Sequence, residues 1–134
     1  MQVVIFKLND EQFAVETAKV QSISDMMEVT KVPKAPKSIK GIINLRGNII
    51  PLLNLNLLLN IDKLHDGVQQ NIIIVSLEEE SVGISVDQVD EVLEVEENMI
   101  ETINDKDKKA YIRGIINFKD RIVTLIDIDK LMLN

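Results

Sequence analysis

The chain has 134 residues, of which 46% are hydrophobic and only 3% aromatic, with no cysteine and a formal net charge of −7. A chain of this length buries roughly two-thirds of its unfolded surface, so one compact domain over residues 1–134 with an aliphatic core is expected. The acidic balance argues against a nucleic-acid-binding protein, which usually has a basic face, and the absence of cysteine excludes disulfides and thiolate metal sites.

Each half of the chain is predicted to begin with a β-hairpin. Apolar, β-branched runs over residues 3–8 and 12–15 flank a polar turn at residues 9–11. The same order recurs over residues 72–86. Short apolar runs on either side of a polar turn are typical of antiparallel hairpins. A helical turn is expected near residues 16–19.

A further hairpin follows in each half and forms the clearest internal repeat. Residues 39–52 (IKGIINLRGNIIPL) reappear without a gap as residues 112–125 (IRGIINFKDRIVTL), 73 positions later. The tip of the first copy is expected at Arg46 and Gly47, because glycine suits a turn position with positive φ. Asp120 replaces Gly47 in the second copy, and aspartate also tolerates that region.

A weaker echo covers the first hairpins. Residues 6–15 resemble residues 75–84 at an offset of 69, and the alignment continues until Ile23 meets Val92. The offset has grown to 73 at Ile112, so the second copy contains four extra residues after Val92. The matched apolar rhythm and the shared order of elements predict an internal duplication.

The predicted fold is mainly β, with helix confined to short segments over residues 54–59 and 127–133. Several short strands joined by tight turns favour small barrels or a sandwich. The repeat halves, approximately 1–65 and 66–134, are each marginal alone, so we expect them to share an apolar interface. Pro51 lacks an N–H donor, which predicts that its strand is an edge strand or bulged there.

Charge is segregated along the chain. Residues 31–46 carry five basic side chains and no acid, whereas residues 76–107 carry twelve acids against one lysine, Lys106. This pattern is compatible with two solvated faces. It is also compatible with electrostatic steering of a partner, which mainly changes association rate and specificity.

No constellation of residues points to catalysis. His65 is the only histidine, and a lone loop histidine is usually neither a metal ligand nor a base. The five glycines lack the spacing of a phosphate-binding loop, and the carboxylates lack the calcium-loop pattern. We therefore expect no catalytic residue, metal or cofactor, and a binding surface on short strands that takes a peptide strand or a helix.

The repeat and its flanks resemble the CheW-like domains of bacterial and archaeal chemotaxis. Residues 39–47 are similar to the family signature, with two prolines upstream. Residues 82–92 (VGISVDQVDEV) resemble its central motif, and residues 111–114 and 125–127 resemble its C-terminal motifs. The resemblance spans nearly the whole chain in order.

The resemblance implies two five-stranded SH3-like β-barrels packed around a shared apolar core, with short helices. It also implies a non-catalytic cytoplasmic adaptor that joins the cytoplasmic tip of chemoreceptors to the regulatory domain of the histidine kinase CheA. Such an adaptor is recruited to membrane-associated receptor arrays without inserting into the bilayer. The apolar stretches agree, since they are far shorter than the roughly 20 residues of a membrane span.

The family's receptor-facing groove is implied at six positions of this chain: Val20, Ile23, Gly41, Asn44, Arg46 and Val92. Gly41 would let a helix approach the backbone closely. Val20, Ile23 and Val92 are equally compatible with plain core positions. The kinase-facing surface is implied at the barrel ends, with Ile72, Gly83 and Leu125 as its candidates.

One position departs from the family pattern. Many members have a glutamate at the position of Ser22, where it could pair with Arg46. Here either Glu16 or Glu28 substitutes for it, or Arg46 is free to reach a partner. The second copy keeps the acid as Glu91. We predict that Arg46→Ala weakens coupling but leaves thermal stability nearly unchanged.

Two alternative readings keep the fold and change its context. The chain could be the adaptor half of a CheV-type protein or the regulatory domain of the kinase. A chain that begins at the first predicted strand and ends with the last predicted helix argues against both, provided that it was not trimmed. A β-barrel enzyme is the alternative from another class, and the missing acid–base and phosphate-binding signatures argue against it.

Overall fold

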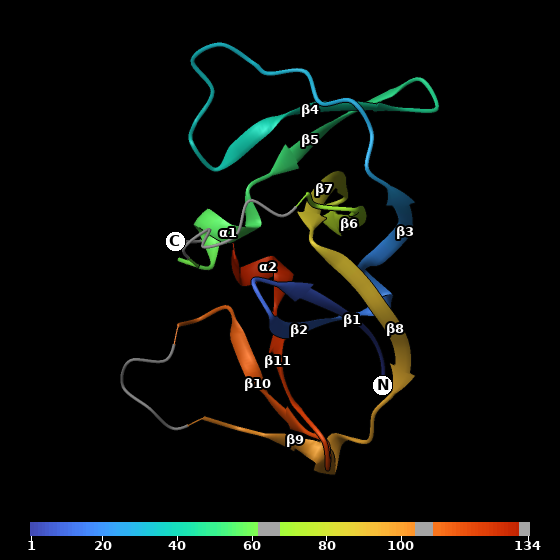
Figure 1. Cartoon of the computed structure of the whole chain (residues 1–134), viewed down its shortest axis with the longest axis vertical. Coiled ribbons are helices and arrows are strands. Elements are labelled where there is room, and N and C mark those ends of the chain that lie inside the picture. The colour runs from blue at the N-terminus through green and yellow to red at the C-terminus, as the bar shows by residue number, and fades with distance from the viewer. Residues whose placement is uncertain (62–67, 104–108, 132–134) are drawn as a thin grey trace.

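The computed structural model describes residues 1–61, 68–103 and 109–131 (Figure 1). Strands dominate these residues, as the sequence predicts, and the helices are short. The elements are β1 (Gln2–Leu8), β2 (Glu11–Glu16), η1 (Thr17–Lys19), β3 (Val20–Asp25), β4 (Ile39–Leu45), β5 (Asn48–Leu53), α1 (Leu55–Leu58), β6 (Asn71–Leu77), β7 (Glu80–Val86), β8 (Gln88–Glu94), η2 (Glu97–Met99), β9 (Ile100–Glu101), β10 (Ile112–Asn117), β11 (Ile122–Ile126) and α2 (Ile128–Leu131).

The strands form two curled sheets stacked along the long axis of the molecule (Figure 1). One sheet, here called barrel A, has the order β8-β1-β2-β11-β10-β9. The other, barrel B, has the order β3-β6-β7-β5-β4. This confirms the predicted pair of small barrels. Barrel A differs in one detail, because the two-residue strand β9 adds a sixth member to its sheet.

Both barrels take strands from both halves of the chain. The first hairpin, β1–β2, pairs with β8 and β11 of the second half in barrel A. The hairpin β6–β7 pairs in the same way with β3 and β5 of the first half in barrel B. The registers correspond, since Leu52 lies opposite Gly83 and Leu125 lies opposite Ala14. The halves are therefore interleaved. The sequence predicts only a shared apolar interface between them, whereas in the structure they also share both sheets.

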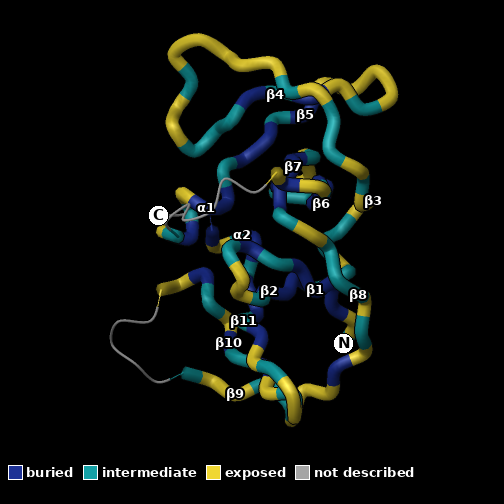
Figure 2. The backbone as a smooth tube through the Cα atoms, viewed as in Figure 1, coloured by how far each residue is buried: buried dark blue, intermediate teal, exposed yellow. Residues whose placement is uncertain are grey.

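Three apolar clusters fill this arrangement. Figure 2 shows in dark blue that buried residues lie on strands of both barrels. Alternate residues of β1 serve two of the clusters, with Val3 and Ile5 inside barrel A and Val4 and Phe6 between the barrels. Strand β6 does the same in barrel B. A strand that is buried on both faces needs a continuous apolar run, which explains why these strands are the most apolar segments of the chain.

A glycine and a bulge recur at the start of the repeated motif. The ladder between β4 and β5 shifts register between Ile39 and Gly41. A Cβ atom on Gly41 would lie 2.4 Å from the carbonyl oxygen of Thr30. On the equivalent Gly114 it would lie 2.8 Å from the carbonyl oxygen of Glu101. The close approach expected at Gly41 is therefore made by the chain's own backbone.

The two copies of the motif end in different turns. Arg46 and Gly47 have φ values of 53° and 87°, and the pair Leu45–Asn48 flanks them. Two positive φ values in a two-residue loop define a type I′ turn, and the prediction for Gly47 is confirmed. The prediction for Asp120 is wrong, because it has no positive φ. In that copy the strand pairing ends at Asn117–Ile122, and beyond it the Phe118 N–H donates to the Arg121 carbonyl at 2.9 Å.

Pro51 does not lie on an edge strand, because β5 runs between β4 and β7. Its partner Ile42 uses its own N–H and C=O to bond Thr30, at 2.8 and 2.9 Å. No ladder bond to β4 is therefore needed at Pro51. On the other side, pairing with β7 begins only at Leu52. The prediction that β5 is an edge strand is therefore wrong. Pro51 nevertheless lies where neither neighbouring strand needs a backbone N–H donor from it.

Candidate functional site

Strands β3 and β8 each expose one large apolar side chain. Ile23 on β3 is 40% exposed and Val92 on β8 is 45% exposed, and these two residues occupy the same position of the repeat. Asn71 connects the strands, because its side-chain amide donates to the Ser24 carbonyl at 3.5 Å and its oxygen accepts from the Val89 N–H at 3.1 Å. Two of the predicted receptor-facing residues are thus exposed on strands that Asn71 links.

The other predicted receptor-facing residues are distributed differently. Val20 is half-buried and packs on the core between the barrels, and Gly41 is buried. Asn44 and Arg46 are exposed at the tip of the β4–β5 hairpin. The side-chain oxygen of Asn44 accepts from the Gly47 N–H at 2.9 Å, which fixes the turn.

The guanidinium group of Arg46 contacts no acid among the residues that the structure describes. Glu16 does not substitute for the missing partner, since it forms an ion pair with Arg113. In the second copy, Glu91 pairs with Arg121. Arg121 aligns with Asn48 and not with Arg46, so the acid of the second copy serves a different arginine.

A cavity of about 430 Å³, here called the hairpin pocket, lies between β3 and the β4–β5 hairpin. Its polar lining comes from β3, β5 and β7, and its apolar lining comes mainly from the hairpin. The lining residues are Gln21, Ser22, Leu45, Asn48, Ile49, Ile50, Pro51, Ile74, Glu80 and Ser81. Ser22 therefore faces the same space as the two residues that flank the Arg46–Gly47 turn.

The three predicted kinase-facing residues are buried. Ile72 and Leu125 are 0% exposed and lie inside barrels B and A, respectively. Gly83 is buried on β7, where an added Cβ would lie 3.1 and 3.2 Å from side-chain atoms of Leu52 and Ile72. None of the three presents a side chain to a partner in this structure.

Sequence reasoning missed a pair of exposed isoleucines at the barrel ends. Ile49 is 61% exposed and Ile122 is 63% exposed. They are separated by the repeat offset of 73, so each barrel carries one at the same place. The signal was present in the sequence, because both follow a polar hairpin tip and break the alternation of inward-facing apolar residues.

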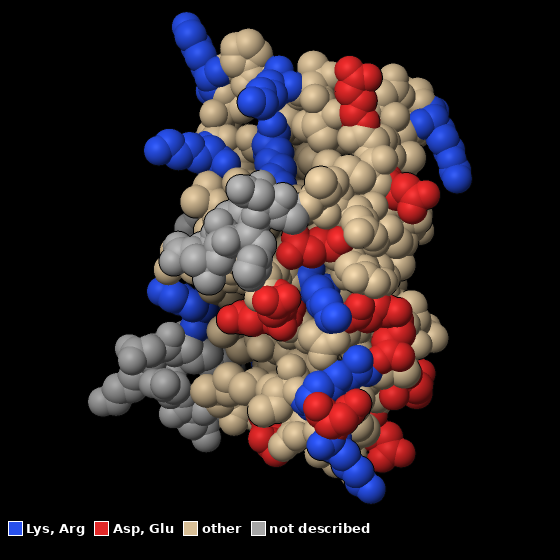
Figure 3. Space-filling model, in the orientation of Figure 1, with Lys and Arg blue, Asp and Glu red and all other residues tan. Residues whose placement is uncertain are grey.

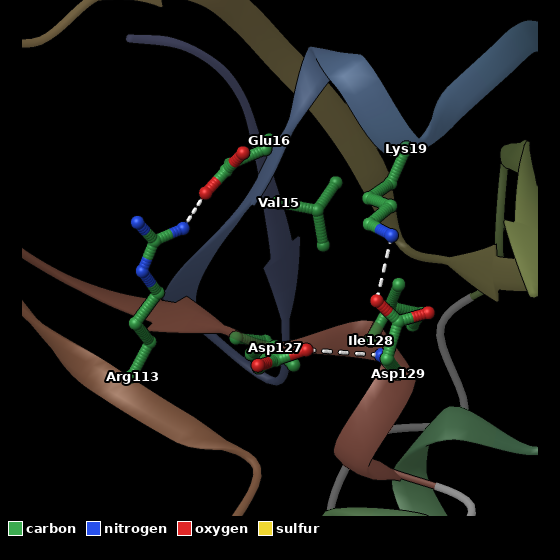
Figure 4. Close-up of a pocket in the computed structure, with 8 residues that line it drawn as sticks. Val15, Glu16, Lys19, Arg113, Asp127, Ile128 and Asp129 are labelled. Atoms are coloured by element: carbon green, nitrogen blue, oxygen red, sulfur yellow. Dashed lines mark hydrogen bonds and ion pairs between the residues drawn. The ribbon is translucent and has the colours of Figure 1, made fainter.

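A smaller cavity of about 110 Å³ lies beside α2 and is lined by two ion pairs (Figure 4). Arg113 pairs with Glu16, and the Lys19 ammonium lies 2.6 Å from the Asp129 carboxylate. The hydrogen bond to Asp129 raises the pKa of Lys19 above its ordinary value. These pairs tie β2 and η1 to β10 and α2.

Charge is distributed unevenly over the face shown in Figure 3. Lysine and arginine side chains gather at the end that carries β4 and β5, and acidic side chains gather lower, near β8. The segregation along the sequence therefore persists in space. Exposed charges of this kind act on encounter with a partner more than on stability.

His65, the only histidine, lies outside the described residues. Among the residues that are described, no group of three acidic or histidine side chains could hold a metal ion. No helix in the same part of the chain has the length and apolar character required to cross a membrane.

Comparisons with known proteins agree with this architecture. The model of the CheW-like domain matches residues 2–134. The chemotaxis protein CheW of Thermotoga maritima is 30% identical over 132 residues, 98% of this chain and 87% of that protein. CheW of Bacillus subtilis is 29% identical over 129 residues, 94% of this chain and 83% of that protein.

A solved structure is similar over the same extent. The crystal structure of the scaffolding protein TtCheW from Thermoanaerobacter tengcongensis superposes with a TM-score of 0.87 and 32% sequence identity. The match covers 97% of this chain and 86% of that one. The family model and the relatives each cover nearly the full described fold. The chain therefore belongs to the CheW-like domain family.

Proposed function

We propose that the chain is a non-catalytic chemotaxis adaptor that couples the cytoplasmic tip of chemoreceptors to the histidine kinase CheA. The observation that carries the proposal is the match to the CheW-like domain over residues 2–134. Relatives named chemotaxis protein CheW and a scaffolding protein of the same fold support it. In this role the protein acts at membrane-associated receptor arrays through its surfaces and not through a reaction.

The surface along β3 and β8 is the proposed receptor contact. Ile23 and Val92 are large apolar side chains exposed on two strands that Asn71 links, and an amphipathic helix binds by placing its apolar face on such side chains. Asn44 and Arg46 extend the contact toward the hairpin tip. Val20 and Gly41 support this surface without being exposed on it. Val20 packs on the core between the barrels, and Gly41 lies against the Thr30 backbone.

The barrel ends are the proposed kinase contacts. Ile49 and Ile122 are more exposed than Ile23 and Val92. In this proposal, the buried residues Ile72, Gly83 and Leu125 act indirectly, by holding the barrel walls that support these ends.

A pull-down with purified partners tests the proposal. The chain is offered separately to the kinase regulatory domain and to a receptor signalling fragment, and both should be captured. Ile23→Asp should reduce capture of the receptor fragment, because it places a charge on the apolar surface. Val68→Asp is the matched control, since Val68 is 81% exposed and lies on neither surface. Capture of neither partner by the unmodified chain would refute the adaptor assignment.

A further inference from the structure

We propose that the hairpin pocket of barrel B accepts an arginine side chain from an extended segment of a partner protein. The proposal concerns the pocket and does not depend on which partner delivers the arginine. It rests on the internal repeat, because barrel A shows which side chains of the chain itself occupy the inner part of the same place.

In barrel A the chain's own arginine occupies the inner part of the corresponding place, and a cavity of about 520 Å³ remains outside it, lined by Arg121, Ile122 and Glu11 among others. The guanidinium group of Arg121 lies 5.1 Å from the centre of the Phe118 ring and donates to the Glu91 carboxylate. Glu91 lies opposite Ile5 in the β1–β8 ladder. The Arg121 side chain is 25% exposed, so most of it lies in the fold.

Each of these residues is smaller and uncharged in barrel B. Asn48 replaces the arginine, Leu45 replaces the aromatic ring, and Ser22 replaces the acid. The backbone positions are kept, because Ser22 lies opposite Ile74 as Glu91 lies opposite Ile5. All three replacements line the hairpin pocket, and so does Ile74. The hairpin pocket thus reaches inward to the positions of Glu91 and Phe118, which do not line the corresponding cavity of barrel A.

The lining matches the two parts of an arginine side chain. Leu45, Ile49 and Pro51 form an apolar wall for the methylene stem. Glu80 and Ser22 offer oxygen acceptors for the guanidinium group, which presents five donors in a fixed plane. Among the residues that the structure describes, one carboxylate and no basic side chain line the pocket.

The charges on the β7 side of the pocket favour a cation. Glu78 and Glu79 form the turn next to Glu80, so three acids lie on the β7 side. Arg46 lies in the turn on the opposite side but is not part of the lining. A carboxylate that meets a guanidinium group forms a charge-assisted hydrogen bond, stronger than a bond between neutral groups.

The backbone beside the pocket favours delivery of the arginine by an extended segment. Strand β7 pairs with β6 along its length, but with β5 only at Gly83 and Ile84. Pro51 ends that pairing, as described above. The part of β7 at Glu80 and Ser81 consequently borders the pocket without a strand partner on the β5 side. An incoming strand can use such backbone groups while its side chain enters a pocket.

The test is a titration followed by NMR of the backbone amides, with the whole chain and three peptides. The first is the acetylated, amidated hexapeptide Phe-Lys-Asp-Arg-Ile-Val, which copies residues 118–123. The other two replace its arginine with lysine or with citrulline, a neutral side chain of the same shape. We expect shifts at Ser22, Asn48 and Glu80, and about tenfold weaker binding of the citrulline peptide, the loss expected for a charge-assisted bond.

Two sets of variants decide where the peptide binds. The double variant Ser22→Glu with Asn48→Arg rebuilds the ion pair of barrel A inside the pocket and should abolish binding. Glu80→Gln should weaken binding about tenfold, whereas Glu78→Gln, which changes an acid outside the pocket, should not. If the double variant does not fold, the comparison of Glu80→Gln with Glu78→Gln still tests where the peptide binds.

Three results would overturn the proposal. The first is equal affinity for the arginine and citrulline peptides. The second is binding that survives in the rebuilt double variant. The third is binding that occurs only after Arg46→Ala, which would show that the pocket belongs to the chain's own Arg46 and not to a partner.

Discussion

Replacing Gly41 with alanine should destabilise the protein by roughly 3 kcal/mol, because the new methyl group has no space. Its Cβ would lie 2.4 Å from the Thr30 carbonyl oxygen and 2.8 Å from a Val29 methyl carbon. To relieve the overlap, the strand must move from Thr30. That movement breaks two hydrogen bonds between Thr30 and Ile42, of 2.8 and 2.9 Å, worth about 1 kcal/mol each. Repacking Val29 costs about 1 kcal/mol more.

Urea unfolding followed by circular dichroism measures this loss, which corresponds to a melting temperature lower by roughly 10 °C for a domain of this size. Gly47→Ala is the matched control, since a Cβ there meets nothing within 4 Å and only the φ of 87° opposes it. It should cost about 1 kcal/mol. If Gly41→Ala costs no more than Gly47→Ala, the packing explanation is wrong and Gly41 is available to a partner.

Three further predictions concern exposed positions. Arg46→Ala should leave the melting temperature nearly unchanged while reducing capture of the receptor fragment, and a drop of many degrees would make Arg46 structural. Glu79→Gly should stabilise the protein by about 0.5–1 kcal/mol in urea unfolding, because Glu79 has a φ of 68°; no gain would mean that the turn is not strained. The Asp129 hydrogen bond raises the pKa of Lys19, so the stability from this pair is complete below the unfolded lysine pKa of about 10.4 and is lost above it. Urea unfolding of the unmodified chain and of Lys19→Met should give a difference in unfolding free energy that is smaller near pH 11 than at pH 7. The same difference at both pH values would contradict a contribution from this ion pair.

The strands that sequence reasoning identified are those with a continuous apolar run. Strands β1 and β6 are buried on both faces and could be read directly from their Ile and Val residues. Strands β3 and β8 were not assigned as strands, because most of their residues are exposed or half-buried and polar. These two weakly patterned strands carry Ile23 and Val92, so the least predictable part of the fold bears the proposed receptor surface.

The exchange of hairpins between the halves could not be predicted from periodicity. An alternating pattern specifies which residues of β1 face a core, but it does not specify which sheet the strand joins. The same limit explains the three kinase-facing candidates. Ile72, Gly83 and Leu125 were assigned to a barrel end by resemblance, whereas their place in the ladders turns them inward. Exposure depends on pairing, and pairing is a property of the whole fold.

At two matched positions, barrel A has a glutamate that pairs with an arginine where barrel B has a serine. In barrel A, matched positions hold the ion pairs Arg113–Glu16 and Arg121–Glu91. In barrel B, the residues equivalent to the two acids are Ser85, which accepts from Lys40, and Ser22.

Because the framework is shared, these changes affect the surface and leave the ladders unaltered. Barrel A closes its own polar sites with charged pairs, and barrel B leaves acceptors beside its exposed hairpin. The halves are interleaved, so a partner that binds one barrel end contacts a barrel built from strands of both halves of the chain. Duplication thus supplies one interleaved fold with two ends of similar architecture and different chemistry, which suits an adaptor between two unlike partners.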